Sequence, residues 1–331
     1  MRAITVEAPG QPSVLKIGTV PAPKLAAQEI RLKVKSAGVN RADCMQREGK
    51  YPPPPGASTI IGLECCGTVQ EIGADVPADS FRVGQRVMAL LSGGGYAEEV
   101  CVDAGWVLPA PESMSDEEAG GLMEATLTAY LNIFEVAGAQ AGQLVLIHGG
   151  GSGVGTAAIA LCKAKGVKTL VTAGSDGKVQ QCLEHGATWA FNYKTEDWAG
   201  RVKQAAEPSG VHIVLDCVGA PYLQMNLECL APEGCIVYIA AQGGAIVKEL
   251  DLWVLMRKRI RLIGSTLRSR SAAFKTALVR KFGEDFRAEL ARGDIRPVVD
   301  KVYKLESAEL AHMHMESGRN FGKIVLTAAP L

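Results

Sequence analysis

The chain has 331 residues, of which 47% are hydrophobic and 21% are charged, so it is long enough for two domains and apolar enough to bury a sizeable core. Lysine plus arginine match aspartate plus glutamate at 35 each, which excludes recruitment of nucleic acid or an anionic membrane by an overall electrostatic field. Any partner must therefore be recognised at a local site.

The start of the chain and its cysteines favour a cytoplasmic protein. Residues 1–10, MRAITVEAPG, contain no basic segment followed by a long apolar stretch, and the sequence has no run of about 18 apolar residues that would span a membrane. The nine cysteines are odd in number and lie mostly within apolar segments, which is typical of reduced thiols rather than of a disulfide framework.

Residues 1–122 are rich in turns and in short β-like runs, such as EIRLKVKSAGV and GLECCGTVQEIG. The segment YPPPPGAS carries four consecutive prolines, so it is excluded from helix interiors and central strands. This region is therefore predicted to form an antiparallel, partly closed β domain.

From about residue 123, apolar runs alternate with helix-like segments. Apolar runs without polar alternation are typical of strands covered on both faces, and six of them separated by helices predict a doubly wound parallel sheet. The runs are LVLIH (144–148), KTLVTA (168–173), WAFNY (189–193), HIVLDCV (212–218), CIVYIA (235–240) and RIRLIGS (259–265).

After residue 266 this pattern breaks, and VVDKVYKL and GKIVLTA are expected to return to the first domain as strands. Two domains are therefore predicted. The β domain is discontinuous and consists of residues 1–122 and 266–331, and the α/β domain, residues 123–265, is inserted into it.

A glycine-rich segment, LIHGGGSGVG, lies between the first of these strands and the first helix. Close approach of the main chain there would let amide N–H groups and the helix N-terminus hold a pyrophosphate. The dinucleotide fingerprint is met only in part, because Gly150 and Gly155 take its outer positions while Ser152 stands in the middle. The alternative is a flexible turn without a ligand. His148 is interpreted as a hydrogen-bonded core histidine rather than a catalyst.

The end of the second strand, TAGSDGKVQ, decides between dinucleotides. A carboxylate about 4 Å from a 2′-phosphate would cost roughly 4 kcal/mol at an effective dielectric near 20, and about 1 kcal/mol in water. A favourable interaction of Lys178 with the 2′-phosphate would contribute a similar free energy. The charges of Asp176 and Lys178 alone therefore do not decide which dinucleotide binds. Alternatively, Asp176 caps the helix that begins near Lys178.

Several long motifs together resemble a known family. The chain resembles the zinc-free quinone oxidoreductases of the medium-chain dehydrogenase/reductase superfamily over nearly its whole length. The resemblance is carried by NRADCMQREGKYPPPPGAS, GLECCG, MALLSGGG, LIHGGGSGVGTAAI, LVTAGS, FNYKTED, LDCVG, LRSR and GKIVL. It implies a six-stranded Rossmann sheet inserted in a discontinuous GroES-like barrel, with NADPH as cofactor. It also implies a homodimer in which the strand RIRLIGS pairs with the same strand of the second subunit.

The resemblance also implies a set of cofactor-binding residues. The 2′-phosphate would be held by Gly174, Ser175, Lys178 and Tyr193, with Asp176 directed elsewhere. The remaining cofactor residues are Gly150, Ser152, Gly153, Val154, Gly155, Ala240, Ala241, Gln242, Gly243, Ser265, Thr266, Leu267, Arg268 and Asn320. For Arg268, a solvated position at a domain junction is the alternative.

No metal is expected, because the ligand positions of zinc-dependent relatives carry other residues. Asn40 stands where the first cysteine would be, Leu63 replaces the histidine, and Glu124 or Ala125 stands near the third position. Without a Lewis acid, an acceptor already activated by conjugation is favoured. Quinones satisfy this requirement, and so do enones, enals and enoyl thioesters.

The acceptor is expected to contact Tyr51, Asn40 and Thr128, which the resemblance implies as catalytic residues. Tyr51 precedes the four prolines, and its ring is suited to stacking on a quinone. Alternatively, Tyr51 covers the edge of a domain, and Asn40 is a turn residue that bonds its own backbone.

A basic run, RKRIRL, raises the possibility of nucleic-acid binding. It overlaps a predicted strand and lacks interleaved aromatic residues that would stack bases, so RNA binding or a crystallin-like structural role is kept only as an alternative to catalysis.

Overall fold

The computed structural model describes residues 1–328 and divides the chain into two compact units. The first unit contains residues 1–127 and the described residues from 267 onward, and the second contains residues 128–266. The boundary falls within α3 (Met123–Tyr130).

The first unit is built on a seven-stranded sheet with the order β14-β15-β3-β4-β5-β7, in which β6 also pairs with β3. Its strands are β3 (Glu29–Val39), β4 (Glu64–Ile72), β5 (Arg86–Leu90), β6 (Glu99–Asp103), β7 (Val107–Pro109), β14 (Val299–Lys304) and β15 (Lys323–Thr327). A separate two-stranded sheet pairs β1 (Arg2–Thr5) with β2 (Lys16–Thr19). Because β15 pairs antiparallel with β3, the predicted return of GKIVLTA to the first domain is confirmed.

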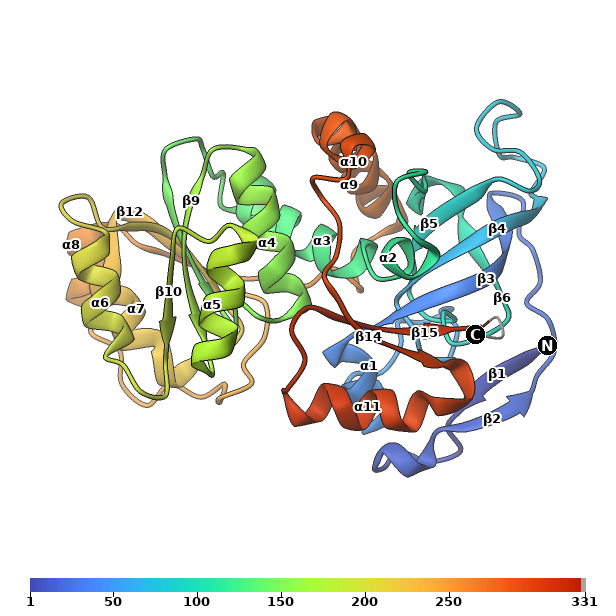
Figure 1. The fold of residues 1–331 in the computed structure, drawn as a ribbon, viewed down its shortest axis with the longest axis horizontal. Coiled ribbons are helices and arrows are strands. Elements are labelled where there is room, and N and C mark those ends of the chain that lie inside the picture. Colours follow the sequence, from blue (N-terminus) through green and yellow to red (C-terminus); the bar gives the residue numbers. More distant parts are fainter. Residues whose placement is uncertain (329–331) are drawn as a thin grey trace. The chain divides into compact units, whose positions relative to one another are not determined.

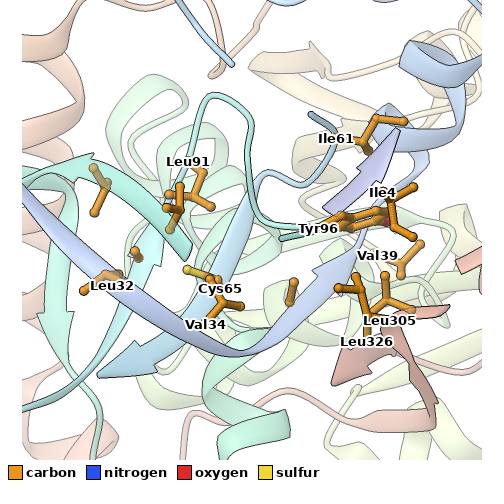
Figure 2. Close-up of a cluster of buried hydrophobic side chains, with 14 of the residues drawn as sticks. Ile4, Leu32, Val34, Val39, Ile61, Cys65, Leu91, Tyr96, Leu305 and Leu326 are labelled. Carbon is orange, nitrogen blue, oxygen red and sulfur yellow. The ribbon is translucent and has the colours of Figure 1, made fainter. Parts of the chain in front are cut away.

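The core of this unit joins segments that are far apart in the sequence. Figure 2 shows Ile4 beside Tyr96, while Val34 and Leu326 belong to the same buried cluster. The helices of this unit are α1 (Arg41–Arg47), α2 (Asp116–Gly120), α9 (Ala272–Asp285), α10 (Arg287–Arg292) and α11 (Ala308–Ser317). The proline segment at residues 52–55 lies outside helices and strands, as predicted.

The second unit contains a six-stranded parallel sheet with the order β10-β9-β8-β11-β12-β13, drawn from green to orange in Figure 1. Its strands are β8 (Leu144–His148), β9 (Lys168–Ala173), β10 (Trp189–Asn192), β11 (Val211–Asp216), β12 (Leu230–Tyr238) and β13 (Arg261–Gly264). Its helices are α4 (Gly153–Ala164), α5 (Asp176–His185), α6 (Trp198–Ala205), α7 (Leu223–Cys229) and α8 (Leu252–Lys258). All five residues of β8 are buried, in agreement with its unbroken apolar pattern. The predicted doubly wound fold is confirmed.

The last predicted strand is shorter than expected. The chain forms α8 up to Lys258, and Arg259 then adopts a left-handed conformation with φ of 53°, so β13 begins only at Arg261. The basic run RKRIRL is therefore divided between a helix end and a strand. Lys258 donates to the carbonyl groups of Leu227 and Leu230, at 2.9 and 2.7 Å, and so caps the end of α7.

No helix among the described residues is both long and apolar enough to cross a membrane. All nine cysteines are free thiols in the structure.

Candidate active site

The segments predicted to bind the dinucleotide in the second unit all follow the carboxyl ends of its strands. Because the six strands are parallel, these segments meet at one edge of the sheet, where doubly wound proteins bind ligands. They are Gly150 and residues 152–155 after β8, Gly174, Ser175 and Lys178 after β9, Tyr193 after β10, residues 240–243 after β12, and Ser265 with Thr266 after β13.

The turn after β8 requires glycine for steric reasons. Gly149 has φ of +73°, a Cβ on Gly150 would lie 2.9 Å from Cβ of Val171, and a Cβ on Gly155 would collide with the Gly149 carbonyl oxygen. Ser152 caps α4 and accepts a hydrogen bond from the Gly155 N–H at 3.0 Å. The turn is therefore tightly packed, which argues against the alternative of a flexible connection.

This turn is suited to an anionic group. The first N–H groups of a helix have no acceptor within the helix, so those of Gly153 and Val154 are available to a ligand at the start of α4. Side chains are excluded from the cradle by the glycines, which leaves space for a pyrophosphate to approach the main chain.

The second and third strands bring together the four residues implied for the 2′-phosphate. A Cβ on Gly174 would lie 2.8 Å from the hydroxyl of Tyr193, so these two residues are in contact. Ser175 caps α5 and accepts from the Lys178 N–H at 3.3 Å.

The alternative that Asp176 caps this helix is wrong. Ser175 is the cap because it keeps extended backbone angles, whereas Asp176 is already the first helical residue. The Asp176 carboxylate instead accepts a hydrogen bond from the side-chain amide of Asn192 at 2.7 Å.

The remaining strand ends are organised by Asp216, a residue that the sequence analysis missed. Its buried carboxylate accepts hydrogen bonds from the N–H groups of Val218 and Gly219, at 2.5 and 2.9 Å, and from the Asn226 amide at 2.8 Å. Gln242 and Gly243 in turn donate to the carbonyl groups of residues 217 and 218, at 3.0 and 2.8 Å. The motif LDCVG, a carboxylate at the end of an apolar strand, was the available signal.

Ser265 offers a second indication of a ligand at this edge. Its side-chain oxygen is buried, and no described residue forms a hydrogen bond with it. A buried hydroxyl without a partner is costly, so a polar group of a bound ligand would stabilise this position.

His148 is a core histidine, as predicted. Its ring nitrogens lie 3.0 Å from the Thr172 hydroxyl and 2.8 Å from the Asn226 amide oxygen. Burial lowers its pKa, which keeps the ring neutral.

In the first unit, Asn40 is held by a buried ion pair. Lys323 donates to the Asn40 amide oxygen at 2.6 Å and to the Glu64 carboxylate at 2.7 Å, and the Asn40 amide nitrogen donates to Glu64 at 3.0 Å. The side chains of Lys323 and Glu64 are 2% and 0% exposed. The other Glu64 oxygen accepts from the N–H of Glu124 at 2.9 Å. The amide oxygen of Asn40 is thus occupied by an internal cation.

Neither Lys323 nor Glu64 was assigned a role from the sequence. The signal for Lys323 was a lysine at the start of GKIVL, in a strand whose five residues are all buried. The signal for Glu64 was a glutamate in the otherwise apolar GLECCG.

A second buried network extends from Asn40. The Asp43 carboxylate accepts from the Asn40 N–H at 2.7 Å and from the Tyr96 hydroxyl at 3.2 Å, and that hydroxyl lies 3.1 Å from a ring nitrogen of His312. Burial raises the pKa of Asp43 to about 7 and lowers the pKa of His312 to about 3. At neutral pH this network therefore contains a neutral histidine.

Tyr51 is fixed by Arg268. The guanidinium donates to the Tyr51 carbonyl at 3.3 Å, to the Ser92 carbonyl at 2.8 and 3.0 Å, and to the Gln46 amide oxygen at 2.7 Å, and it lies 5.3 Å from the centre of the Tyr51 ring. Arg268 is only 4% exposed, which overturns its interpretation as a solvated residue. It positions the Tyr51 segment.

The remaining predicted site residues are divided between the two units. Thr128 lies in α3 within the second unit, where its carbonyl accepts from Asn132 at 2.7 Å. Leu267 and Asn320 belong to the first unit, and the Asn320 amide donates to the Gly322 carbonyl at 2.9 Å.

Among residues 1–328, no group of three or more histidine, cysteine, aspartate or glutamate side chains is arranged to hold a metal ion. Asn40, at the position of the first zinc ligand of zinc-dependent relatives, and Glu64, next to the second position, both bind the ammonium group of Lys323.

Comparison with known proteins places the chain in a class. The family described as "Alcohol dehydrogenase GroES-like domain" matches residues 26–112, and that described as "Zinc-binding dehydrogenase" matches residues 153–282. The fold and the strand-end site thus define a dinucleotide-dependent oxidoreductase of the medium-chain dehydrogenase/reductase superfamily.

Individual relatives identify the family within this superfamily. Quinone oxidoreductase of Rattus norvegicus is 30% identical over 98% of this chain and 97% of its own length. The structure of Escherichia coli quinone oxidoreductase complexed with NADPH is 27% identical, with a TM-score of 0.86 over 99% of this chain and 100% of that one. An NAD-dependent alcohol dehydrogenase is 28% identical, with a TM-score of 0.87 over 99% and 100% of the two chains. The chain belongs to the quinone oxidoreductase family of this superfamily.

Proposed function

We propose that the protein is an NADPH-dependent quinone oxidoreductase that works without a metal ion. The observation that carries the proposal is a pair of adjoining features at the strand ends. The glycine turn after β8 is suited to an anion, and Gly174 after β9 contacts Tyr193 after β10, with Lys178 four residues beyond Gly174. When bound, NADPH supplies the hydride that reduces the acceptor.

The residues of the second unit would bind and orient this cofactor. Main-chain N–H groups at the start of α4 hold the pyrophosphate, and Ser175, Lys178 and Tyr193 hold the 2′-phosphate. The engagement of Asp176 by Asn192 supports this, because it gives the rival carboxylate a partner of its own. The unpartnered Ser265 hydroxyl is suited to a polar group of the nicotinamide end.

The residues of the first unit would bind the acceptor. Tyr51 presents an aromatic ring whose main chain is anchored by Arg268, which suits it to stacking on a quinone. Asn40 is oriented by Lys323. Thr128, which belongs to the second unit, remains a proposed contact of the acceptor. The two units are accordingly proposed to act as acceptor-binding and cofactor-binding domains.

Initial rates with 1,2-naphthoquinone or 9,10-phenanthrenequinone, measured with NADPH and with NADH, test the proposal. We expect a preference for NADPH and no loss of activity with chelators. Equal use of NADH, or inactivation by a chelator, would overturn it. Faster turnover of enones or enoyl thioesters than of any quinone would identify the alternative reductase, and tight RNA binding without turnover would favour a non-catalytic role.

The variant Lys178→Ala sharpens the choice of cofactor. Losing one charge contact to the 2′-phosphate is expected to weaken NADPH binding about tenfold, or ~1.4 kcal/mol, and to leave NADH binding unchanged. Lys24→Ala is the matched control, because Lys24 is exposed in the first unit and its side chain has no described partner. Equal weakening of both nucleotides would contradict the assignment.

We also propose a cytoplasmic homodimer that uses the β13 edge. This strand ends the sheet, and the preceding α8 exposes Leu252, Trp253 and Met256 by 61%, 75% and 65%. An unpaired edge beside exposed apolar side chains is typical of an interface. Light scattering should give a dimer mass for the parent and a monomer mass for Trp253→Glu; a monomeric parent at micromolar concentration would contradict the proposal.

A further inference from the structure

Glu124 has a carboxyl group that the internal structure does not use. It is the second residue of α3, its side chain is only partly exposed, and its main-chain N–H is held by Glu64 at 2.9 Å. Its own carboxyl group forms no hydrogen bond or ion pair with any of residues 1–328. A half-buried carboxyl without an internal partner is available to a ligand.

The groups around Glu124 come from several elements of the first unit. Two carboxylates, Glu64 on β4 and Asp43 on α1, repel its charge, while Lys323 on β15 and Lys275 on α9 attract it. The charge of Glu124 also favours the protonated forms of two further groups, Tyr51 and Arg268.

The nearby cations are committed elsewhere. Lys275 donates to the Ser92 hydroxyl at 2.7 Å and lies 4.4 Å from the centre of the Trp106 ring, and Arg268 donates to neutral oxygens only. Lys323 is paired with Glu64 at 2.7 Å. The Glu124 carboxyl group therefore has charged groups around it but forms no ion pair with any of the described ones.

This environment favours the protonated acid. Burial, reinforced by the charge of Glu64, raises the pKa of Glu124 to about 8. An ordinary carboxyl is ionised at pH 7 and has no proton to donate, whereas Glu124 retains its proton there.

We propose that the carboxyl group of Glu124 is the general acid of the reaction, contacting the acceptor beside Tyr51 and protonating the oxygen that becomes negative during reduction. This inference rests on the proposed function. The hydride brings one hydrogen and two electrons to the acceptor. The O–H bond of Glu124 then breaks, its proton forms the new O–H bond of the hydroquinone, and the resulting carboxylate takes a proton from water.

Lys323 and Glu64 have a positioning role in this arrangement. Lys323 binds the Glu64 carboxylate at 2.7 Å, Glu64 accepts a hydrogen bond from the main-chain N–H of Glu124, and the charge of Glu64 opposes ionisation of Glu124. The charge of Lys323 acts on Glu124 in the opposite sense and favours its ionised form, so the contribution of Lys323 to this arrangement is to position Glu64.

The test compares Glu124→Gln with the parent enzyme and with Glu112→Gln, an exposed control with no described partner. General acid catalysis contributes about 10²- to 10⁴-fold, so kcat with quinones should fall by that factor in Glu124→Gln and remain unchanged in the control. NADPH binding, followed by nucleotide fluorescence, should be the same in all three proteins. The parent kcat should decline above about pH 8 as Glu124 ionises, and this decline should be absent from Glu124→Gln.

A direct readout is the infrared titration of the ligand-free protein. The parent should show two carboxylic-acid C=O bands above pH 6: that of Asp43, which disappears near pH 7 in both proteins, and a second, which disappears near pH 8 and is missing from Glu124→Gln. If Glu124→Gln does not fold, the titration of the parent and the retained pH dependence of Glu124→Asp provide the same test. A parent without the second band, or Glu124→Gln with parental kcat and pH profile, would overturn the inference alone; a parent that reduces no quinone would overturn the proposed function as well.

Discussion

The two units arrange their polar groups in opposite ways. The first unit buries formal charges on side chains, with Lys323 and Glu64 paired at 2.7 Å. The second presents uncharged main-chain N–H groups at the start of α4. An unpaired charge in an interior costs several kcal/mol, so the ion pair must be complete at all times, whereas a helix start is satisfied by water until a ligand arrives. Changes in the first arrangement should therefore affect stability, and changes in the second should affect binding.

The largest expected effect comes from breaking the ion pair. Lys323→Met leaves Glu64 buried without its cation and should reduce the free energy of unfolding by about 3–5 kcal/mol. Urea unfolding measures the change, with Lys24→Met as an exposed control. The double variant Lys323→Met with Glu64→Gln should recover part of the loss; a single variant as stable as the parent would show that the pair is dispensable.

An intermediate effect is expected from filling the glycine cradle. In Gly155→Ala the new methyl group meets the Gly149 carbonyl and displaces the turn, so NADPH affinity should fall tenfold to a hundredfold, or about 1.4–2.8 kcal/mol. Calorimetry measures the binding. The matched control is Gly177→Ala, where a Cβ has no neighbour within 4 Å. If Gly155→Ala bound NADPH normally but unfolded more easily than the parent, the expectation that changes in the second unit affect binding rather than stability would be contradicted.

The smallest expected effect concerns pH. His312 has a folded pKa of about 3, below its ordinary 6.5, so it should destabilise the protein as pH falls from 6.5 toward 3 and have no effect above 6.5. Asp43, with its folded pKa raised to about 7, acts in the opposite sense: its contribution is full below its ordinary 3.8 and is lost as pH rises through 7.

Replacing the histidine separates these two contributions. In His312→Gln the loss of stability on acidification should be smaller than in the parent by about 2 kcal/mol near pH 5. Thermal unfolding measured between neutral and acidic pH gives the comparison. Parallel curves for the two proteins would assign the acid sensitivity to other groups.

The sequence predicted the architecture well because its signals are local or periodic. Six unbroken apolar runs identified the parallel strands, and the shift of β13 arose because α8 extends to Lys258 and places the strand start two residues later. The glycine turn was predictable because its sterics involve residues close in sequence, such as Gly149 and Gly155. The choice of helix cap between Ser175 and Asp176 was not, since both residue types are good caps and only the backbone angles decide.

The sequence by itself determined the two-domain fold, the place of the dinucleotide turn and the family, because hydrophobic periodicity and contiguous motifs are written in neighbouring residues. Only the tertiary structure decided the internal arrangement of the polar groups of the first unit. Lys323 meets Glu64 across 259 positions of sequence, and Arg268 reaches Tyr51 across 217. Such contacts depend on which strands become neighbours, and the local sequence around either partner carries no record of the other.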